Sequence, residues 1–304
     1  MRLGLHALGI GAGADRAVID AVASAADSCG FATLWAGEHV VMVDRPGSRY
    51  PYSADGVIGV PAEADWLDPM IALSFAAAAS SRIGIATGVL LLPEHNPVVV
   101  AKQAASLDRL SGGRLTLGVG VGWSKEEFAA LSVPFAHRGA RTAEYVAAMR
   151  TLWRDDVASF EGNVVCFDSI RVNPKPVRGR IPIVLGGNSD AALRRVATWG
   201  DGWYGFNLDD TAAVHDRVAT LDRLCAESGR DRGRLRLSVA LCDPSPGDLG
   251  ALAELGVDEL VLVQAPPEEP EEAAEWVSAL AQKWIVPLEN AVDQQHRWLL
   301  RRHD

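Results

Sequence analysis

Short apolar runs alternate with segments of helical periodicity along most of the chain, and this unit occurs eight times. The first unit joins an apolar run at 2–7 to a helical segment at 14–29. In that segment Val18 and Val22 share one face, and Gly30 follows as a stop signal. Further strands are expected at 32–36, 83–91, 115–120, 181–185, 202–206, 235–241 and 259–263. Further helices are expected at 68–80, 97–110, 124–131, 138–153, 189–198, 211–228, 248–255 and 271–284.

Eight such units form either a closed (β/α)8 TIM barrel or a doubly wound open sheet. Strands that are buried on both faces read as continuous apolar runs, as in the segments IPIVL and IGIATGVLLL. A dinucleotide-binding open sheet requires G-x-G-x-x-G after its first strand, whereas Gly9, Gly11 and Gly13 give G-x-G-x-G. Glu38 only lies near the position that would bind a ribose. The pattern therefore favours a single α/β barrel domain over residues 1–304.

Two segments interrupt the alternation. Residues 39–67 form a long loop rich in Pro, Gly and Tyr, and loops of this length are often active-site lids. Residues 157–177 predict a β-hairpin inserted before the fifth strand. The residues after Pro287 are polar and charged, so we expect 288–304 to be a peripheral tail.

Composition narrows the cellular setting. Hydrophobic residues make up 48% of the 304 residues and charged residues 22%, which is ordinary for a globular protein. The four cysteines are scattered, without a C-x-x-C pair or a histidine at metal-ligand spacing. We therefore expect reduced thiols, no metal site and a cytoplasmic location. The net charge of −10 argues against extensive nucleic-acid binding, and we expect a small-molecule substrate as the partner.

Two apolar stretches need a separate interpretation. The first twenty residues superficially resemble a signal peptide, but His6 and four glycines interrupt the apolar region. A first barrel strand that leads into a helix explains them better. The longest apolar helical stretch, at 69–79, is too short to span a bilayer, so no membrane association is expected.

In a barrel, catalytic groups come from the carboxyl ends of the strands and the loops that follow. Glu38 and His39 follow the second strand. A neutral histidine there can accept or donate a proton near pH 7. It can equally be a structural histidine bonded to the backbone. Trp203 and Tyr204 on the sixth strand either wall a pocket or pack outward.

Glycines mark three further strand ends. In the third strand, Gly88 and Val89 indicate a bulge or the close approach of a ligand, with tight packing as the alternative. The following residues 94–96 fit a plain turn better than polar cofactor contacts. Near the end of the fourth strand, Gly120 and Gly122 continue an alternation that begins at Gly118. Such a face either accepts a flat ligand or relieves crowding inside the barrel.

The fifth strand ends in a turn that opens a helix. Gly186 and Gly187 let backbone N–H groups approach an anion, and the helix N-terminus adds partial positive charge. Asn188 or Ser189 could instead simply cap the helix. Asp190 is a counter-argument, because its carboxylate competes for the same positive end.

At these residues the sequence resembles the luciferase-like monooxygenase superfamily, and within it the actinobacterial branch commonly assigned to coenzyme F420. The resemblance spans roughly residues 1–265. It rests on the segments LWAGEHV, YPYSADG with WLDP, RIGIATGVLLLPEHNPVVVAKQAASLDRLSGGRLTLGVGVGW, EGNVVCFDSIRVNPKPV and IPIVLGGNSDAALRRVATWGDGWYGF.

The resemblance implies a homodimeric barrel with the cofactor ring over the strand ends. It implies a bulge at Gly88–Val89, often with a non-prolyl cis peptide, that supports the ring. The implied cofactor-binding residues are Gly88, Val89, Gly120, Gly122, Gly186, Gly187, Asn188 and Ser189. His39 falls where F420-dependent sugar-phosphate dehydrogenases place a catalytic histidine. Those enzymes carry a glutamate directly after the glycines of the fourth strand, and Trp123 in that position speaks against their substrate class.

The expected function is hydride transfer between F420 and an alcohol, a carbonyl compound or an activated alkene. His39 would move the accompanying proton, with Glu38 as a second catalytic candidate. Three alternatives stay open. They are an FMN-dependent monooxygenase supplied by a separate reductase, a non-catalytic flavin- or deazaflavin-binding protein, and a phosphate-binding barrel isomerase or aldolase. The last of these often needs a catalytic lysine or a carboxylate cluster at the strand ends, and the sequence offers neither.

Overall fold

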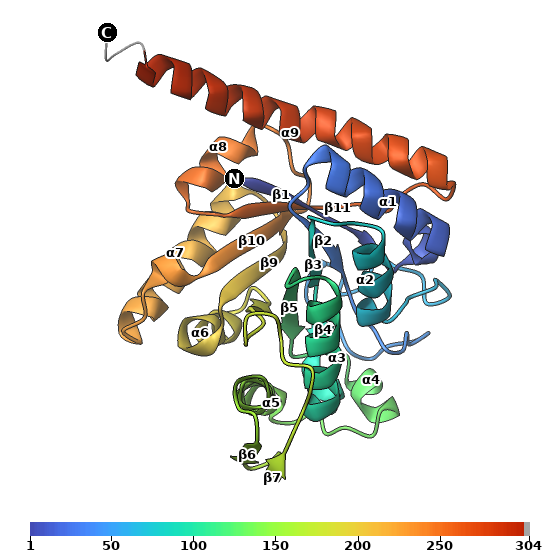
Figure 1. The fold of residues 1–304 in the computed structure, drawn as a ribbon, viewed down its shortest axis with the longest axis vertical. Coiled ribbons are helices and arrows are strands. Elements are labelled where there is room, and N and C mark those ends of the chain that lie inside the picture. The colour runs from blue at the N-terminus through green and yellow to red at the C-terminus, as the bar shows by residue number, and fades with distance from the viewer. Residues whose placement is uncertain (301–304) are drawn as a thin grey trace.

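A computed structural model describes the backbone of residues 1–300 and the side chains of residues 1–286. Eight parallel strands form a closed barrel (Figure 1), as the sequence predicts. They are β1 (Arg2–Leu8), β2 (Thr33–Ala36), β3 (Gly84–Thr87), β5 (Leu115–Gly120), β8 (Ile183–Gly186), β9 (Gly202–Leu208), β10 (Arg236–Leu241) and β11 (Glu259–Val263). The ring closes because β1 pairs with β11 and β3 pairs with β5.

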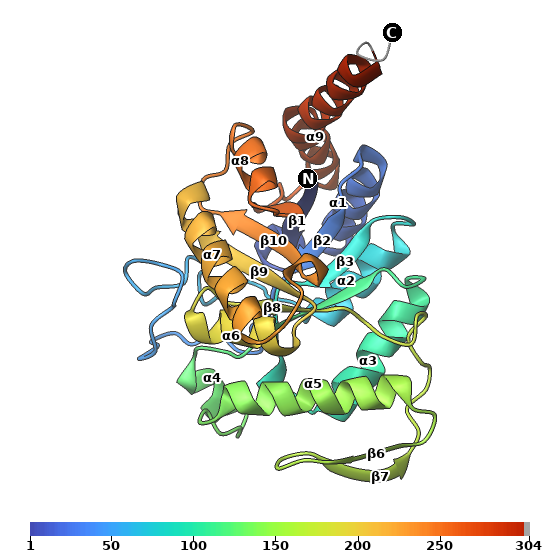
Figure 2. The ribbon, with the colours of Figure 1, turned by 90° about the vertical axis from the view of Figure 1, so that its left-hand side faces the viewer.

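Helices surround the barrel and alternate with its strands (Figure 2). They are α1 (Arg16–Cys29), α2 (Pro69–Ala78), α3 (Pro97–Leu110), α5 (Arg138–Arg154), α6 (Asp190–Trp199), α7 (Thr211–Glu227), α8 (Asp248–Glu254) and α9 (Pro270–Leu300). A short extra helix, α4 (Lys125–Ala130), lies in the connection between β5 and α5. Turns of 3₁₀ helix occur at η1 (Gly11–Ala14), η2 (Leu92–Glu94) and η3 (Arg232–Arg234). No described helix combines the length and the apolar composition that crossing a membrane requires.

Local signals in α1 account for its limits. The Asp15 carboxylate accepts the N–H groups of Ala17 and Val18, which would otherwise lack partners at the helix start. Gly30 adopts the left-handed conformation with φ of 88°, which ends the helix at low steric cost. The apolar face between these residues packs into the core between barrel and helices.

The barrel interior is filled from the strands alone. A small cluster of fully buried side chains comes from six different strands, and its members are Trp35, Ala86, Val184, Tyr204, Ala240 and Val261. The barrel is therefore a packed core rather than a pore, and a ligand has room only above this layer.

The third strand is split, which corrects the expected single strand at 83–91. The chain bulges at Gly88–Val89, where the peptide bond is cis, and resumes as β4 (Leu90–Leu91) beside β5. The predicted bulge and cis peptide are therefore confirmed. The predicted hairpin is also confirmed, as β6 (Ala158–Glu161) and β7 (Cys166–Ile170), and lies outside α5.

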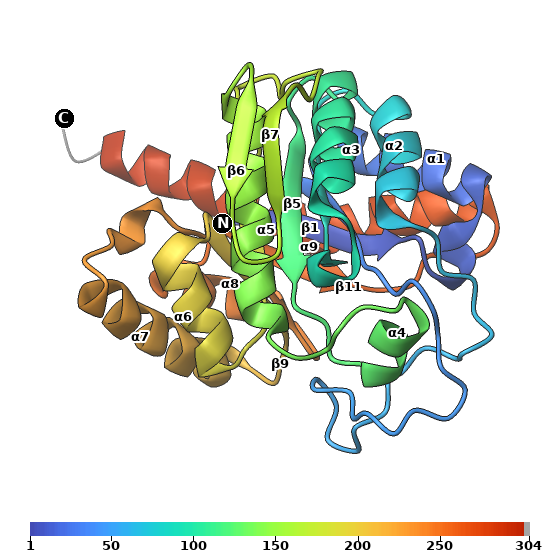
Figure 3. The same ribbon diagram turned by 90° about the horizontal axis from the view of Figure 1, so that it is seen from below.

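Residues 39–67 contain no helix and no strand, and they cover one end of the barrel beside α4 (Figure 3). The last helix differs from expectation. It was expected to end at residue 284, whereas α9 continues to Leu300. The expected peripheral tail at 288–304 concerns residues whose side chains, and for 301–304 whose backbone, lie outside the described part.

Candidate functional site

A cavity of about 600 Å³ lies at the carboxyl ends of the barrel strands, where the loops after most strands converge. All ten residues that the sequence nominates line this one cavity: Glu38, His39, Gly88, Val89, Gly120, Gly122, Gly186, Gly187, Asn188 and Ser189. The structure thus brings them together, and their individual roles remain predictions. The described residues include no group of His, Cys, Asp and Glu side chains arranged to hold a metal ion.

His39 is held by a buried carboxylate from α4. Its Nδ1 lies 2.8 Å from Oε2 of Glu127, whose side chain is fully buried. The other oxygen of Glu127 accepts the backbone N–H groups of Val40 and Val41. This carboxylate therefore fixes both the imidazole and the chain next to it. Nε2 is the ring nitrogen left to face a ligand.

Glu38 is engaged in a different way. Its Oε2 accepts the N–H of Leu91 at 2.6 Å, and its Oε1 lies 3.0 Å from Nε2 of His95. Burial lowers the pKa of His95, but the hydrogen bond and the charge of Glu38, with smaller contributions from other carboxylates, raise it above its ordinary value. Glu38 thus ties the end of β2 to the segment after β3. This geometry supports a structural role, and its catalytic role stays a prediction.

Glu94 lies beside these groups in the η2 turn. Both of its carboxyl oxygens are buried without a hydrogen-bond partner in the described structure. Burial first, and then the charges of Glu127 and Glu38, together raise its pKa to about 9. The side chain is therefore a neutral acid near pH 7. The turn predicted at this place is confirmed: the 3₁₀ turn η2 ends at Glu94, and Asn96 caps α3. Nothing in the sequence indicates the raised pKa of Glu94.

The turn after β8 has an open backbone. Gly187 adopts φ of 110°, and a Cβ added there would lie 3.0 Å from Cβ of Ala192. Ser189 is the helix cap, because its Oγ accepts the N–H of Ala192 at 3.3 Å. Asn188 instead binds the backbone of Phe206 through both ends of its amide. The capping and anion-binding interpretations of this turn are therefore compatible.

Two arginines that the sequence analysis missed complete this end of the cavity. Arg138 and Arg195 both line it, and neither has a carboxylate within 4.0 Å among the described residues. Burial lowers the pKa of both guanidinium groups, and Arg138 lowers that of Arg195 further. The competing Asp190 is neutralised by Arg217 at 3.0 Å. The result is a cationic end suited to a phosphate.

Only one of these arginines carried a usable signal in the sequence. Arg195 lies three residues after Ala192, and both face the cavity from α6, as helical spacing allows. Arg138 begins α5 after a long connection. Its Nε–H donates to the carbonyl of Gly122 at 3.0 Å, a contact that depends on tertiary structure.

A second histidine on β1 also lines the cavity. His6 Nδ1 lies 3.1 Å from the hydroxyl of Tyr204, whose ring stacks on Trp35 with centroids 4.5 Å apart. Burial lowers the pKa of His6 to about 4 and raises the pKa of Tyr204 well above its ordinary value. Both groups are therefore neutral near pH 7. In the sequence, His6 is only an interruption of an apolar segment, and nothing there indicates which way Tyr204 points.

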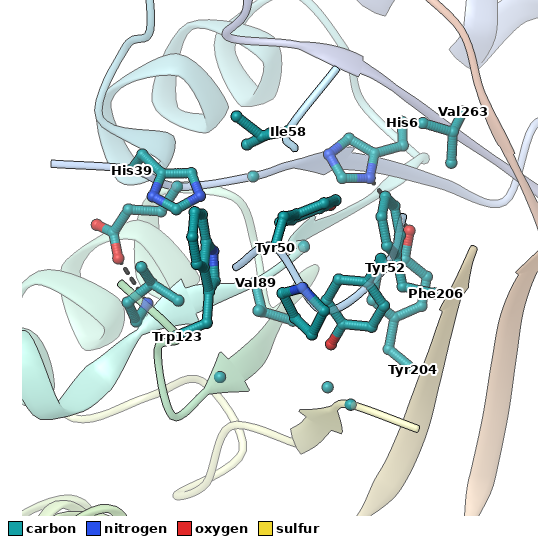
Figure 4. Close-up of a pocket in the computed structure, with 18 of the residues that line it drawn as sticks. His6, His39, Tyr50, Tyr52, Ile58, Val89, Trp123, Tyr204, Phe206 and Val263 are labelled. Atoms are coloured by element: carbon teal, nitrogen blue, oxygen red, sulfur yellow. Dashed lines mark hydrogen bonds between the residues drawn. The ribbon is translucent and has the colours of Figure 1, made fainter. Parts of the chain in front are cut away.

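Aromatic rings form a continuous wall of the cavity, which we call the aromatic belt (Figure 4). Successive ring centroids are 4.9 to 6.2 Å apart. In order, its members are Trp66, His39, Trp123, Tyr50, Tyr52, Phe206 and His6. Four of the seven, including His39, come from the segment 39–67, and Asn207 holds that segment in place through the carbonyl of Tyr52 at 2.7 Å. The segment therefore lines the cavity as well as covering it.

A family model described as luciferase-like monooxygenase matches residues 3–283. An uncharacterized protein of Mycobacterium tuberculosis is 35% identical over 271 residues, which cover 88% of this chain and 95% of that protein. The FMNH2-dependent dimethylsulfone monooxygenase of Pseudomonas putida is 30% identical over 155 residues, which cover 50% of this chain and 42% of that protein.

Solved structures share the fold at lower identity. An F420-dependent secondary alcohol dehydrogenase in complex with an F420–acetone adduct has a TM-score of 0.71 at 15% identity, and the match covers 91% of this chain and 97% of that one. At this level of identity the likeness shows the barrel architecture alone.

Proposed function

The chain belongs to the luciferase-like monooxygenase family, and we propose that within this family it transfers a hydride between coenzyme F420 and a small organic substrate. The substrate would be an alcohol oxidised to a carbonyl compound, or an activated alkene or carbonyl compound reduced in the opposite direction. We further propose a homodimer, on the basis of the family resemblance, and a cytoplasmic location, on the basis of the scattered cysteines.

The cavity fits such a cofactor at both of its ends. Arg138, Arg195 and the start of α6 would hold a phosphate, because the glycine turn leaves their N–H groups accessible. The bulge at Gly88–Val89 would lie against a flat ring. When bound, the deazaflavin supplies a ring carbon that accepts or donates hydride.

The observation that carries the proposal is the pair formed by His39 and Glu127 beside this cavity. Oxidation of an alcohol removes a hydride from carbon and a proton from oxygen, and a positioned base must take the proton. Glu127 orients the imidazole through Nδ1, so Nε2 of His39 can accept the hydroxyl proton. In the reverse reaction the same nitrogen returns it to the carbonyl oxygen. The segment 39–67 limits the entry of water.

The proposal is tested by titrating the purified protein with F420 and with FMN. We expect F420 to bind at least tenfold more tightly, a difference of about 1.4 kcal/mol. Arg195→Gln should weaken F420 binding at least tenfold through loss of the phosphate contact. Arg194→Gln, an exposed neighbour on α6, is the matched control and should bind F420 like the parent protein. Tighter binding of FMN, or FMN that copurifies stoichiometrically, would contradict the assignment to F420.

A second function is supported by the relative from Pseudomonas putida, whose name specifies FMNH2. An FMN-dependent monooxygenase supplied by a separate reductase would use the same cavity. It would consume oxygen when reduced FMN and substrate are added, whereas the F420-dependent enzyme would not. A non-catalytic binding protein would bind one of these cofactors without turnover across a broad panel of substrates.

A further inference from the structure

The cavity contains a second polar group that the proposed reaction does not use. His39 lies near one end of the aromatic belt and His6 lies at the other end (Figure 4). The side chain of His6 is held from behind by Tyr204, in the same manner as Glu127 holds His39. Two oriented imidazoles therefore face one aromatic chamber from different sides.

The hydrogen-bond arrangement decides what His6 offers to a ligand. The hydroxyl hydrogen of Tyr204 has no other acceptor among the described residues, and a phenol is a good donor. The arrangement that satisfies both groups has Tyr204 donating to Nδ1 of His6. The hydrogen of the neutral ring then lies on Nε2, which has no hydrogen-bond partner in the described structure. In Figure 4 this nitrogen is turned toward the side of the cavity where Ile58 lies.

The space between the two histidines presents little unpaired charge to a ligand. Glu38 lines the cavity, but both of its oxygens already accept N–H donors. Burial raises the pKa of Tyr50 above its ordinary value and that of Tyr52 to about 12, so both phenols stay neutral. The two arginines are used by the cofactor phosphate under the proposed function, on which this inference rests. An uncharged aromatic chamber disfavours ionic substrates, because they would lose their hydration without compensation.

We propose that the substrate is an uncharged aromatic or polycyclic molecule that reacts at an oxygen-bearing carbon near His39 and carries a second carbonyl that accepts a hydrogen bond from Nε2 of His6. His6 is thus a specificity-determining residue, and Tyr204 is a positioning residue that fixes its tautomer. The redox balance is that of the proposed function. The reacting alcohol gives a hydride to the deazaflavin and a proton to His39, and the second carbonyl is unchanged.

The test uses two uncharged ketones that differ in a second acetyl group, 2-acetylnaphthalene and 2,6-diacetylnaphthalene. Each is titrated calorimetrically into protein saturated with F420, with 2-naphthoate as an anionic comparison. We expect the diketone to bind at least tenfold more tightly than the monoketone. A factor of two comes from its two equivalent orientations and the rest from one hydrogen bond. The carboxylate should bind most weakly.

His6→Phe should reduce the diketone preference to about the statistical factor of two, while monoketone affinity changes little. Tyr204→Phe, which frees the tautomer without removing His6, should lower the preference at least threefold. It also provides the test if His6→Phe does not fold. His215→Phe, an exposed histidine on α7, should keep the full preference.

The remaining outcomes separate this inference from the proposed function. An unchanged diketone preference in His6→Phe overturns the inference, as does equal or tighter binding of 2-naphthoate by the parent protein. If F420 binding itself is lost in His6→Phe, then His6 contacts the cofactor and the substrate assignment is wrong. If the parent protein does not bind F420, the proposed function fails. In that case the same ketone titrations, made on the protein without cofactor, still decide whether His6 binds the second carbonyl.

Discussion

Glu94 is one of three neighbouring buried carboxyl groups, and hydrogen bonding distinguishes it from the other two, Glu38 and Glu127. Glu38 and Glu127 each accept backbone N–H groups and contact a histidine. Glu94 accepts none, so burial and the two neighbouring charges raise its pKa to about 9. A carboxyl group in this setting keeps its proton when folded and loses it when the chain unfolds at neutral pH.

We predict that Glu94→Leu stabilises the protein, and more so at pH 8 than at pH 5. Between about pH 4.5 and 9, the folded chain binds one proton that the unfolded chain has released, so parent stability falls as the pH rises. Leucine removes this dependence. Urea unfolding at both pH values should show a difference in gain of about 4 kcal/mol, which is about 1.4 kcal/mol for each of the three pH units. Glu254→Leu, at an exposed position on α8, is the control. An equal gain at both pH values would contradict the expected titration.

The second prediction at this scale concerns the proton carrier. His39→Ala should lower turnover about a hundredfold while F420 affinity changes little. Glu127→Gln should lower turnover about tenfold, because the imidazole stays but loses its charged partner and part of its orientation. The measurement is F420 reduction with the best alcohol found in a panel, with His215→Ala as control. Turnover close to that of the parent protein in His39→Ala would make this histidine structural.

Single residues also show where sequence reasoning ends. His39 and Glu38 could be nominated because they directly follow a strand. The partners that define their roles, Glu127 and His95, come from other elements and could not be paired with them. His6 lies in an apolar strand, and nothing local indicates that its ring meets Tyr204 nearly two hundred positions later.

Among the elements, the turn between β8 and α6 was the easiest to predict from the sequence. Its glycines and its capping serine are contiguous in sequence, so their geometry could be predicted. The split of the third strand was predicted only in part. Gly88 indicated a bulge, but the apolar run continued through it and suggested a single strand. The length of α9 was missed, because polar residues after 287 resemble a tail unless the helix is seen.

We predict that Gly187→Val weakens F420 binding at least tenfold while the barrel still folds. Valine at φ of 110° is strained, and its Cβ would crowd Ala192 at the start of α6 where a phosphate would bind. Gly179→Val is a control matched for strain, because Gly179 also has positive φ, at 67°, but is exposed with no neighbour in the space of a Cβ. Thermal melts and F420 fluorescence titrations are needed together. A folded Gly187→Val with parent affinity would limit the turn to helix capping.

For the whole molecule, eight apolar runs predicted the number of strands and the fold class, because strands covered by helices are apolar throughout. The runs could not show how the sheet closes. Closure depends on β3 meeting β5, where the Thr87 hydroxyl donates to the carbonyl of Gly118 at 2.6 Å and the two backbones approach closely. A Cβ on Gly118 would lie 1.9 Å from the carbonyl oxygen of Thr87. The alternating glycines were expected either to accept a flat ligand or to relieve crowding inside the barrel. At Gly118 the second explanation applies. Gly120 and Gly122 line the cavity.

Because Gly118 lies against the backbone of β3 and Gly120 lines the cavity, the same substitution should have different effects at the two positions. Gly118→Ala places a methyl group against a backbone oxygen that cannot move without opening the barrel, so we expect a loss of about 4 kcal/mol or more in the free energy of unfolding. Gly120→Ala meets side-chain atoms of Val89 and Leu91, which can yield in part, so about 1–3 kcal/mol is expected. Because Val89 belongs to the bulge that would support the cofactor ring, Gly120→Ala should also weaken F420 binding. Urea unfolding followed by circular dichroism measures the first effect, and F420 titration of the folded variant measures the second. Equal destabilisation by the two substitutions would show that the β3–β5 contact does not control closure, since only Gly118 touches the backbone of β3.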